Sequence, residues 1–241
     1  MKTHSLLLYL FAALLLLSGC AGKPVDEWTG HIEPEYKKLD KQAKWEWQPA
    51  SNQWQYQDVE WIPPHLPAGS TLYEPRSIAI HLKADPKLNA QLGEPRTLLL
   101  KFIQMSNPAE LDNYRHSSFR LADLMAADSK QLAPDFLREG RVILSPDETK
   151  VLVFDRVKGA AYLAIFAGYF QMTNDASVRV LPIPAVTGRT LAYENKKRWW
   201  WPFARQPFKD SAVSPAGEAA RLKVWLEIGE ERISSLRARA F

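Results

Sequence analysis

The chain has 241 residues, of which 46% are hydrophobic and 24% charged, and its formal net charge is +4 at pH 7. This length fits one large domain or one domain with added segments, and a mild positive charge without a block of Lys and Arg argues against a nucleic-acid partner. The nine Trp and seventeen Pro fall mainly outside the middle of the chain. Their placement predicts a regular core with irregular additions.

The chain begins with a short basic start and an apolar run from Leu6 to Leu17, and small residues then lead to Cys20. These are the parts of a secretory signal peptide, and the run is too short to cross a membrane, which needs about 20 apolar residues. Leu17-Ser18-Gly19-Cys20 resembles the lipobox of bacterial lipoproteins. The resemblance implies removal of residues 1–19 and lipidation of Cys20, the only cysteine. A buried structural thiol or a plainly secreted protein is the alternative.

The residues after this cysteine bear on the membrane that would hold the chain. Ala21-Gly22-Lys23 follow Cys20, whereas lipoproteins kept in the inner membrane often carry Asp at the first of these positions. By resemblance to that sorting rule, we expect the periplasmic face of the outer membrane. Each buried CH₂ contributes about 0.8 kcal/mol, so two or three acyl chains would make a lasting anchor.

Aromatic and polar residues alternate on both sides of a turn at residues 49–52, which predicts a β-hairpin with one aromatic face. Trp45, Trp47, Trp54 and Trp61 belong to this segment. Their rings could stack on sugars such as peptidoglycan, or they could pack against the core or the lipid interface, where Trp is favourable. We favour packing.

From Pro75 onward, alternating or continuous apolar residues predict strands, and helical spacing predicts a helix over residues 117–125 capped by Ser117 or Ser118. A second short helix is expected over residues 134–137 and an amphipathic tail over residues 230–241. The predicted strands cover residues 78–82, 97–105, 141–144, 150–154, 160–170, 178–184 and 222–228.

Two connecting segments are candidates for binding. A polar loop from Ala84 to Arg96 exceeds the usual hairpin length of two to five residues, and such long loops are commonly functional, although it could be a mere solvated connection. A basic and aromatic cluster lies within residues 185–215. Its tryptophans could contact lipid head groups or glycan, or pack on the domain surface. They are Trp199, Trp200 and Trp201.

Residues typical of catalysis form no recognisable pattern. The five His are scattered, and none has the spacing of metal ligands. No Gly-rich phosphate loop, nucleophile elbow or HExxH motif occurs. Ser117 and Ser118 beside His116 are better interpreted as a helix cap than as a nucleophile. We therefore expect no enzyme, no metal, no cofactor and no small-molecule substrate.

The order of these segments resembles the TssJ family, the outer-membrane lipoproteins of type VI secretion systems. The Trp-rich residues 45–61 and 199–201 depart from the family pattern. The matching letters run from Ile78 to about Pro184 and include Leu88-Asn89, Gly93-Glu94-Pro95, Leu99, Lys101 to Met105, Phe119 to Leu124, Leu144 to Glu148 and Ala161 to Phe170.

This resemblance implies a mainly β fold, a two-sheet transthyretin-like β-sandwich with a short helical insertion, and a scaffold role without enzymatic activity. Proteins of the family bind the periplasmic C-terminal region of the inner-membrane protein TssM through the loop between the first two strands. We expect Leu88 and Leu92 to fill pockets of that partner. The partner-binding residues implied here are Asp85, Lys87, Leu88, Asn89, Gln91, Leu92, Gly93 and Glu94.

The predicted function is therefore an outer-membrane lipoprotein that acts as a scaffold in a type VI secretion membrane complex. A cell-wall-binding lipoprotein, or a pilotin-like helper of another secretion or pilus system, is the alternative. The predicted division is a signal peptide (1–19), an anchor, spacer and Trp-rich hairpin (20–74), a β-sandwich core (75–184), a Trp- and Pro-rich loop (185–220) and a last strand with its tail (221–241).

Overall fold

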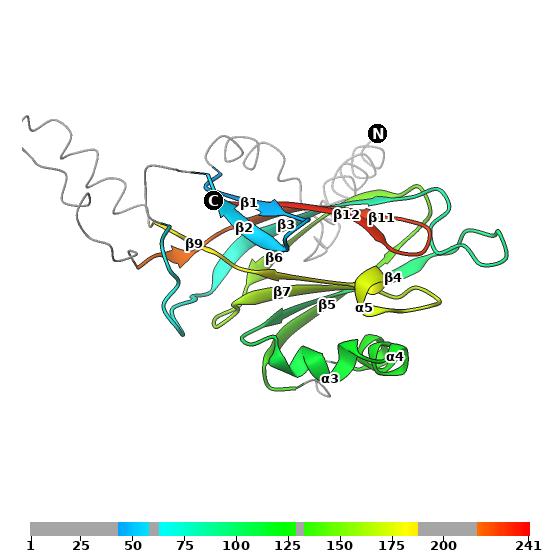
Figure 1. Ribbon diagram of the computed structural model, residues 1–241, viewed down its shortest axis with the longest axis horizontal. Helices are drawn as coiled ribbons and strands as arrows, with labels where there is room; N and C mark the ends of the chain where they lie inside the picture. Colours follow the sequence, from blue (N-terminus) through cyan, green and yellow to red (C-terminus); the bar gives the residue numbers. More distant parts are fainter. Residues whose placement is uncertain (1–42, 58–62, 129–132, 188–215) are drawn as a thin grey trace, which may run out of the picture.

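Alternating apolar residues build two β-sheets that face each other in the computed structural model, which describes residues 43–57, 63–128, 133–187 and 216–241. The described chain is thus a mainly β, two-sheet sandwich with a small helical insertion, as expected (Figure 1). Several predictions concern positions outside the described residues, namely the signal peptide, Cys20, Trp61 and the three tryptophans from Trp199 to Trp201.

The larger sheet has the strand order β2-β1-β12-β11-β3-β6. Its neighbours are antiparallel except for β11 and β3, which run parallel. Strands from both sides of the predicted 75–184 core therefore complete this sheet. Its strands are β1 (Trp45–Gln48), β2 (Gln53–Tyr56), β3 (Glu74–Ala84), β6 (Thr149–Arg156), β11 (Leu222–Ile228) and β12 (Ile233–Ala240).

The smaller sheet has the order β5-β4-β7-β8 and is antiparallel throughout. The apolar segment predicted as a central strand forms β7, which lies between β4 and β8, while β8 is an edge strand that ends at Pro182 as its prolines indicate. The strands are β4 (Leu98–Met105), β5 (Phe136–Leu144), β7 (Tyr162–Ala167) and β8 (Val178–Pro182), and a separate pair is formed by β9 (Ala185–Val186) and β10 (Glu218–Ala219).

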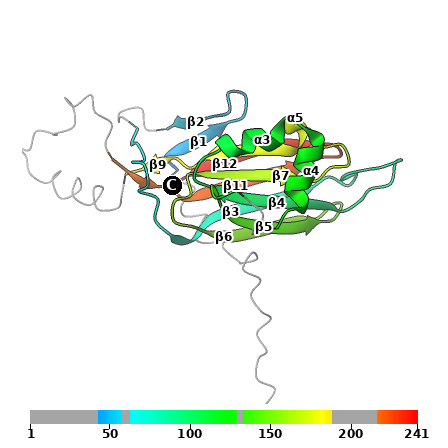
Figure 2. The same cartoon turned by 90° about the horizontal axis from the view of Figure 1, so that it is seen from below.

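The helical insertion lies between β4 and β5 and covers the outer face of the smaller sheet, as Figures 1 and 2 show from two sides. Helix α4 follows Ser117 as predicted, although the Ser117 side chain makes no capping hydrogen bond. The helices are η1 (Ala109–Leu111), α3 (Asp112–Arg115), α4 (Ser118–Ala126) and, before β8, α5 (Asn174–Ser177).

Two predicted elements are wrong. Residues 134–137 do not form a helix, because Phe136 begins strand β5 and pairs with Met105 of β4, and this sheet pairing overrides a four-residue local preference. Residues 230–241 are not a tail but contain β12, which lies between β11 and β1. The inward face of β12 is formed partly by Ala238 and Ala240, whose small side chains give a weak alternation signal.

The main core lies between the sheets, where side chains of β3, β4, β7 and β11 are buried. One polar side chain joins the two sheets inside this core. Gln104 of β4 donates from Nε2 to the Asp155 carbonyl (2.7 Å) and accepts at Oε1 from the Val157 N–H (2.9 Å). Both ends of its amide are therefore satisfied by the edge of β6, which fixes the spacing of the sheets.

A second core packs α4 on the smaller sheet, and a buried lysine fixes the helix there. Lys101 Nζ, fully buried, donates to the carbonyls of Leu124 and Ala127 (2.7 Å each) and forms a close ion pair with Glu139 (2.8 Å). Burial lowers the pKa of Lys101, and Glu139 opposes part of that shift. A cation at the last carbonyls of a helix stabilises it through the helix dipole.

Candidate partner-binding surface

The aromatic hairpin β1–β2 directs its rings into the molecule. Trp45 Nε1 donates to the Ala185 carbonyl and Trp54 Nε1 donates to the Pro182 carbonyl, both at 2.6 Å. Trp47 is buried in the main core, with its ring centroid 5.3 Å from that of Trp54. These three tryptophans therefore pack on the sandwich, as we favoured, and do not form an open platform for sugars.

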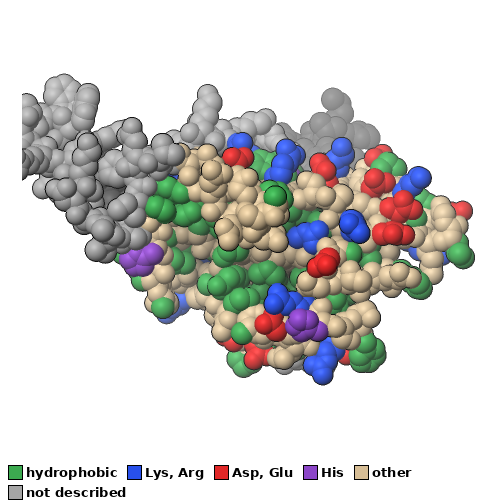
Figure 3. Space-filling view, viewed as in Figure 1, with side chains coloured by type: hydrophobic (Ala, Val, Ile, Leu, Met, Phe, Trp, Pro, Cys, Tyr) green, Lys and Arg blue, Asp and Glu red, His purple; other side chains and the backbone are tan. Residues whose placement is uncertain are grey.

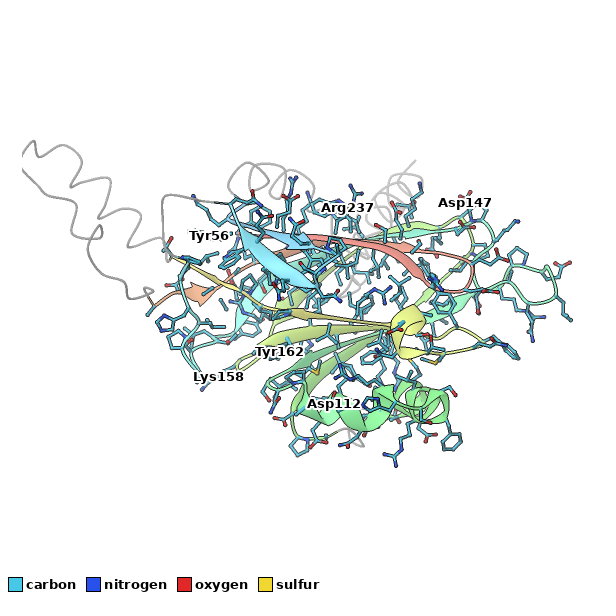
Figure 4. The ribbon with its side chains drawn as sticks, in the orientation of Figure 1. Tyr56, Asp112, Asp147, Lys158, Tyr162 and Arg237 are labelled. Carbon is cyan, nitrogen blue, oxygen red and sulfur yellow. The ribbon has the colours of Figure 1, made fainter. Side chains whose placement is uncertain are left out.

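The predicted loop between β3 and β4 projects from one end of the sandwich in both views (Figures 1 and 2). Asp85 begins it and is held by two neighbouring turns, since its N–H donates to the Ile228 carbonyl (2.8 Å) and its carbonyl accepts from the Asp147 N–H (3.3 Å). In Figure 4, Asp147 lies at this end, whereas Lys158 lies at the opposite one. We call the end with Asp147 the loop end.

The first half of the loop is folded back on the core. Leu88 is 0% exposed and belongs to the main core. Its N–H donates to the Asp85 carbonyl (3.0 Å), and its carbonyl accepts from the Arg96 N–H (2.9 Å). Asp85 Oδ1 also accepts from the Lys87 N–H (2.8 Å). The expectation that Leu88 fills a partner's pocket is therefore corrected, because its side chain already fills the protein's own core.

The loop tip is a tight turn with an unusual residue. The N–H of Gln91 donates to the Glu94 carbonyl (3.0 Å) and the N–H of Glu94 returns a bond to Gln91 (3.1 Å). Leu92 and Gly93 between them have φ values of +55° and +82°. Such two-residue turns favour Asn, Asp or Gly, and the left-handed conformation costs another residue about 1–2 kcal/mol. Leu92 nevertheless occupies it and is 98% exposed.

Seven of the eight predicted residues lie on this loop surface, and the eighth, Leu88, is buried. Sequence reasoning missed Phe170, which follows β7 and is 72% exposed. Its N–H donates to Asn89 Oδ1 (3.2 Å), so it lies against the β3–β4 loop. Phe170 is the last residue of the apolar segment 160–170, which the sequence predicts to be a single strand, so its exposure was not expected. Gly168 directly follows β7, and a glycine within an apolar run is a sequence signal that the strand ends or bends there.

The loop end also differs in charge from the rest of the chain. Figure 3 shows acidic side chains gathered there. The four connections at this end, 85–97, 145–148, 168–173 and 229–232, contain six acidic and three basic residues, although the whole chain has a net charge of +4. The apolar side chain of Leu92 is therefore surrounded by a mildly acidic surface.

A cleft of about 610 Å³ lies elsewhere, between the β1–β2 turn, α5 and β12. Its most buried cation is Arg179, whose guanidinium donates to the carbonyls of Asp175, Val178 and Ile233 at 2.7–2.9 Å. Burial lowers the pKa of Arg179, and Asp175 opposes that shift. Since this arginine is bonded to the backbone of α5, β8 and β12, the cleft is part of the structural junction between the sheets.

Within the described ranges, no group of three or more His, Cys, Asp or Glu is placed to hold a metal ion. None of the helices in that part of the chain is both long and apolar enough to span a membrane.

The fold defines a two-sheet β-sandwich that presents a long, structured loop at one end. Residues 76–198 match the family of type VI secretion lipoproteins described by the names VasD, EvfM and TssJ, and the chain belongs to this family. The match includes the whole β3–β4 loop and every strand of the smaller sheet.

Two solved structures resemble the chain over part of its length. The chain is similar to Serratia marcescens Lip, a membrane-bound component of the type VI secretion system (21% identity, covering 67% of this chain and 95% of that one, TM-score 0.43). It is also similar to the lipoprotein TssJ1 from Pseudomonas aeruginosa (16% identity, 71% and 97% covered, TM-score 0.43). No curated protein matches the chain.

Proposed function

We propose that this protein is a scaffold subunit of a type VI secretion membrane complex and that it binds the periplasmic region of a TssM-like inner-membrane protein through the β3–β4 loop. Family membership supports the secretion role. The observation that carries the binding proposal is Leu92, a large apolar side chain that is 98% exposed in a backbone conformation unfavourable to it. Strain of this kind persists where the surroundings impose it, and it clusters at functional sites.

The loop is prepared for binding because its shape is already fixed. Leu88 anchors it in the core, Asp85 joins it to two adjacent turns, and its tip closes on itself. A loop that is ordered before association loses little conformational entropy when it binds. Burying one Leu side chain contributes about 1.5–3 kcal/mol, which corresponds to about ten- to a hundredfold in affinity.

The decisive test replaces Leu92 with Asn, a residue that suits the left-handed turn. We expect Leu92→Asn to weaken binding to the periplasmic region of the TssM-like protein by at least about tenfold, while the free energy of unfolding stays unchanged or rises by up to about 1 kcal/mol. Biolayer interferometry and urea unfolding give the two quantities. Leu72→Asn is the matched control, because Leu72 is 67% exposed just before β3, away from the loop. Wild-type affinity in Leu92→Asn would exclude the loop as the binding site.

We also propose that a lipid on Cys20 anchors the chain to the periplasmic face of the outer membrane, with residues 20–42 joining the anchor to the sandwich. The lipobox-like Leu17-Ser18-Gly19-Cys20 and the absence of Asp at position 21 support this. Mass spectrometry of the mature N-terminus should find an acylated Cys20. Cys20→Ser should give a soluble or an uncleaved protein that carries no acyl chain, and an unmodified residue 20 in the wild-type protein would contradict the anchor.

A further inference from the structure

The β7–α5 loop, residues 168–173, presents one large apolar side chain between two buried ones. Tyr169 packs in the main core, where its hydroxyl donates to the Gly229 carbonyl (3.3 Å), and Met172 packs in the second core beside α4. Phe170 lies between these anchors and is 72% exposed. Tyr169 and Met172 therefore fix the backbone on both sides of Phe170, whose ring is left on the surface.

Asn89 connects this loop to the β3–β4 loop. Its Oδ1 accepts from the Phe170 N–H (3.2 Å), and its Nδ2 donates to the Thr97 carbonyl (3.2 Å) at the exit of its own loop. Its φ of +48° is one that Asn adopts more readily than most residues. A single amide side chain therefore joins the start of the β7–α5 loop to both sides of the β3–β4 loop, so the two loops form one continuous surface.

From this arrangement we infer that Phe170 is a second apolar anchor of the partner-binding surface, and that Asn89 is a positioning residue that holds it beside the loop carrying Leu92. The inference rests on the proposed function, because the occupant is the same periplasmic partner. The chemistry of the surface specifies that partner further. It must offer apolar pockets for a phenyl ring and an isobutyl group, flanked by basic side chains that complement the acidic excess of the loop end.

An aromatic ring on a rigid loop is a strong anchor for physical reasons. A Phe side chain buries a large apolar area and has only two side-chain torsions to immobilise, so it gives much contact for little loss of entropy. Aromatic residues are accordingly enriched at protein interfaces and clustered with other anchors. Phe170 and Leu92 meet this description on two loops that the Asn89 side chain connects.

The test measures the affinity of the full-length lipoprotein, in detergent, for the periplasmic region of the TssM-like protein. We expect Phe170→Ala to weaken binding at least about tenfold and Phe119→Ala to leave it unchanged. Phe119 is the matched control, because it is equally exposed (74%) but lies on α4 over the outer face of the smaller sheet. Wild-type affinity in Phe170→Ala, or an equal loss in Phe119→Ala, would overturn the inference.

Failure of the Phe170 anchor and failure of the proposed function give different binding results. If Leu92→Asn weakens binding and Phe170→Ala does not, the β3–β4 loop is the binding site and Phe170 is no part of it. If the wild-type protein does not bind the periplasmic region at all, the proposed function fails and the inference fails with it. A loss in both single variants and a non-additive loss in the double variant would support one shared interface.

The positioning role of Asn89 has a readout that needs no partner. Hydrogen exchange of the Phe170 N–H, followed by mass spectrometry, should be faster in Asn89→Ala than in the wild-type protein, because that N–H loses its acceptor. Asn89→Asp keeps an acceptor oxygen and should restore protection. Equal exchange in the wild type and Asn89→Ala would show that Asn89 does not hold the loop.

Discussion

The aromatic hairpin and the β3–β4 loop were both candidates for a binding surface, and the structure uses their apolar residues in opposite ways. In the hairpin, Trp54 bonds to the backbone of β8 at the smaller sheet's edge, Trp45 bonds to the backbone of β9, and Trp47 enters the core. In the loop, Leu92 is directed away from the protein. The hairpin completes the sandwich, whereas the loop leaves an apolar group without a partner of its own.

This difference teaches that the number of aromatic residues is a poor guide to a binding surface. The indole N–H groups of the hairpin find acceptors at the edge of β8 and on β9, and their rings cover apolar side chains. A tryptophan placed in this way stabilises the fold. Leu92 contributes nothing comparable to the fold and occupies a turn position that disfavours it. Its presence is better explained by contact with another molecule.

The largest expected effect tests the structural role of the hairpin. Replacing Trp47 with Ala should lower the free energy of unfolding by about 3–5 kcal/mol, because it opens a cavity between the hairpin and the main core. Urea unfolding followed by circular dichroism measures the loss. Gln55→Ala on the exposed side of β2 is the control and should change stability by less than about 0.5 kcal/mol. A decrease of less than about 1 kcal/mol in the free energy of unfolding of Trp47→Ala would mean that the hairpin does not complete the core.

A somewhat smaller effect should separate two leucines of one loop. Leu88→Ala should lower the free energy of unfolding by about 3 kcal/mol, since Leu88 is fully buried, whereas Leu92→Ala should change it by less than about 0.5 kcal/mol. The same denaturation experiment measures both variants. Equal effects at the two positions would mean that the loop does not have a buried half and an exposed tip.

The smallest effect concerns Tyr73, which is exposed at the start of β3 but donates from its hydroxyl to Asp155 (2.8 Å). Partial burial alone would raise the pKa of Asp155, but hydrogen bonds from the Arg76 N–H and Tyr73, with Arg138 nearby, hold that pKa below its ordinary value. Tyr73→Phe should therefore cost about 0.5 kcal/mol at pH 7.

The pH dependence of this cost follows from the direction of the shift. A carboxylate with a lowered pKa stabilises the folded state above its ordinary pKa, about 3.9, and this stabilisation is lost as the pH falls through the pKa of the folded state. The difference between Tyr73→Phe and the wild type should thus shrink in urea titrations below about pH 4. A constant difference down to pH 2 would contradict the role of Asp155.

Much of the fold could be predicted from periodicity, and the failures have local causes. The hairpin, six of the seven predicted strands after Pro75 and helix α4 were placed within a few residues, because their apolar side chains alternate or recur clearly. The seventh, residues 141–144, is only the second half of β5, and the predicted helix over residues 134–137 overlaps the first two residues of that strand. The sequence does not reveal strand β12, because two consecutive Ser interrupt its alternation and its second half pairs Arg with small Ala side chains.

The candidate site was predictable in its position but not in its details. Loop length and family resemblance located residues 84–96, yet nothing in the letters distinguishes Leu88 from Leu92. Leu92 is exposed because it lies in the turn at residues 91–94, and Leu88 is buried because its side chain packs in the main core. Phe170 could not be found from spacing either, because only the three-dimensional fold brings it to Asn89, a contact between residues 81 positions apart.

The position of β12 has a consequence for the order of events during synthesis. This strand, the last of the described chain, lies between β11 and β1, so the hairpin can join the larger sheet only after β12 has been made. Until then the six-stranded sheet stays incomplete. The first described strands of the chain therefore depend on the last one for their place in the larger sheet.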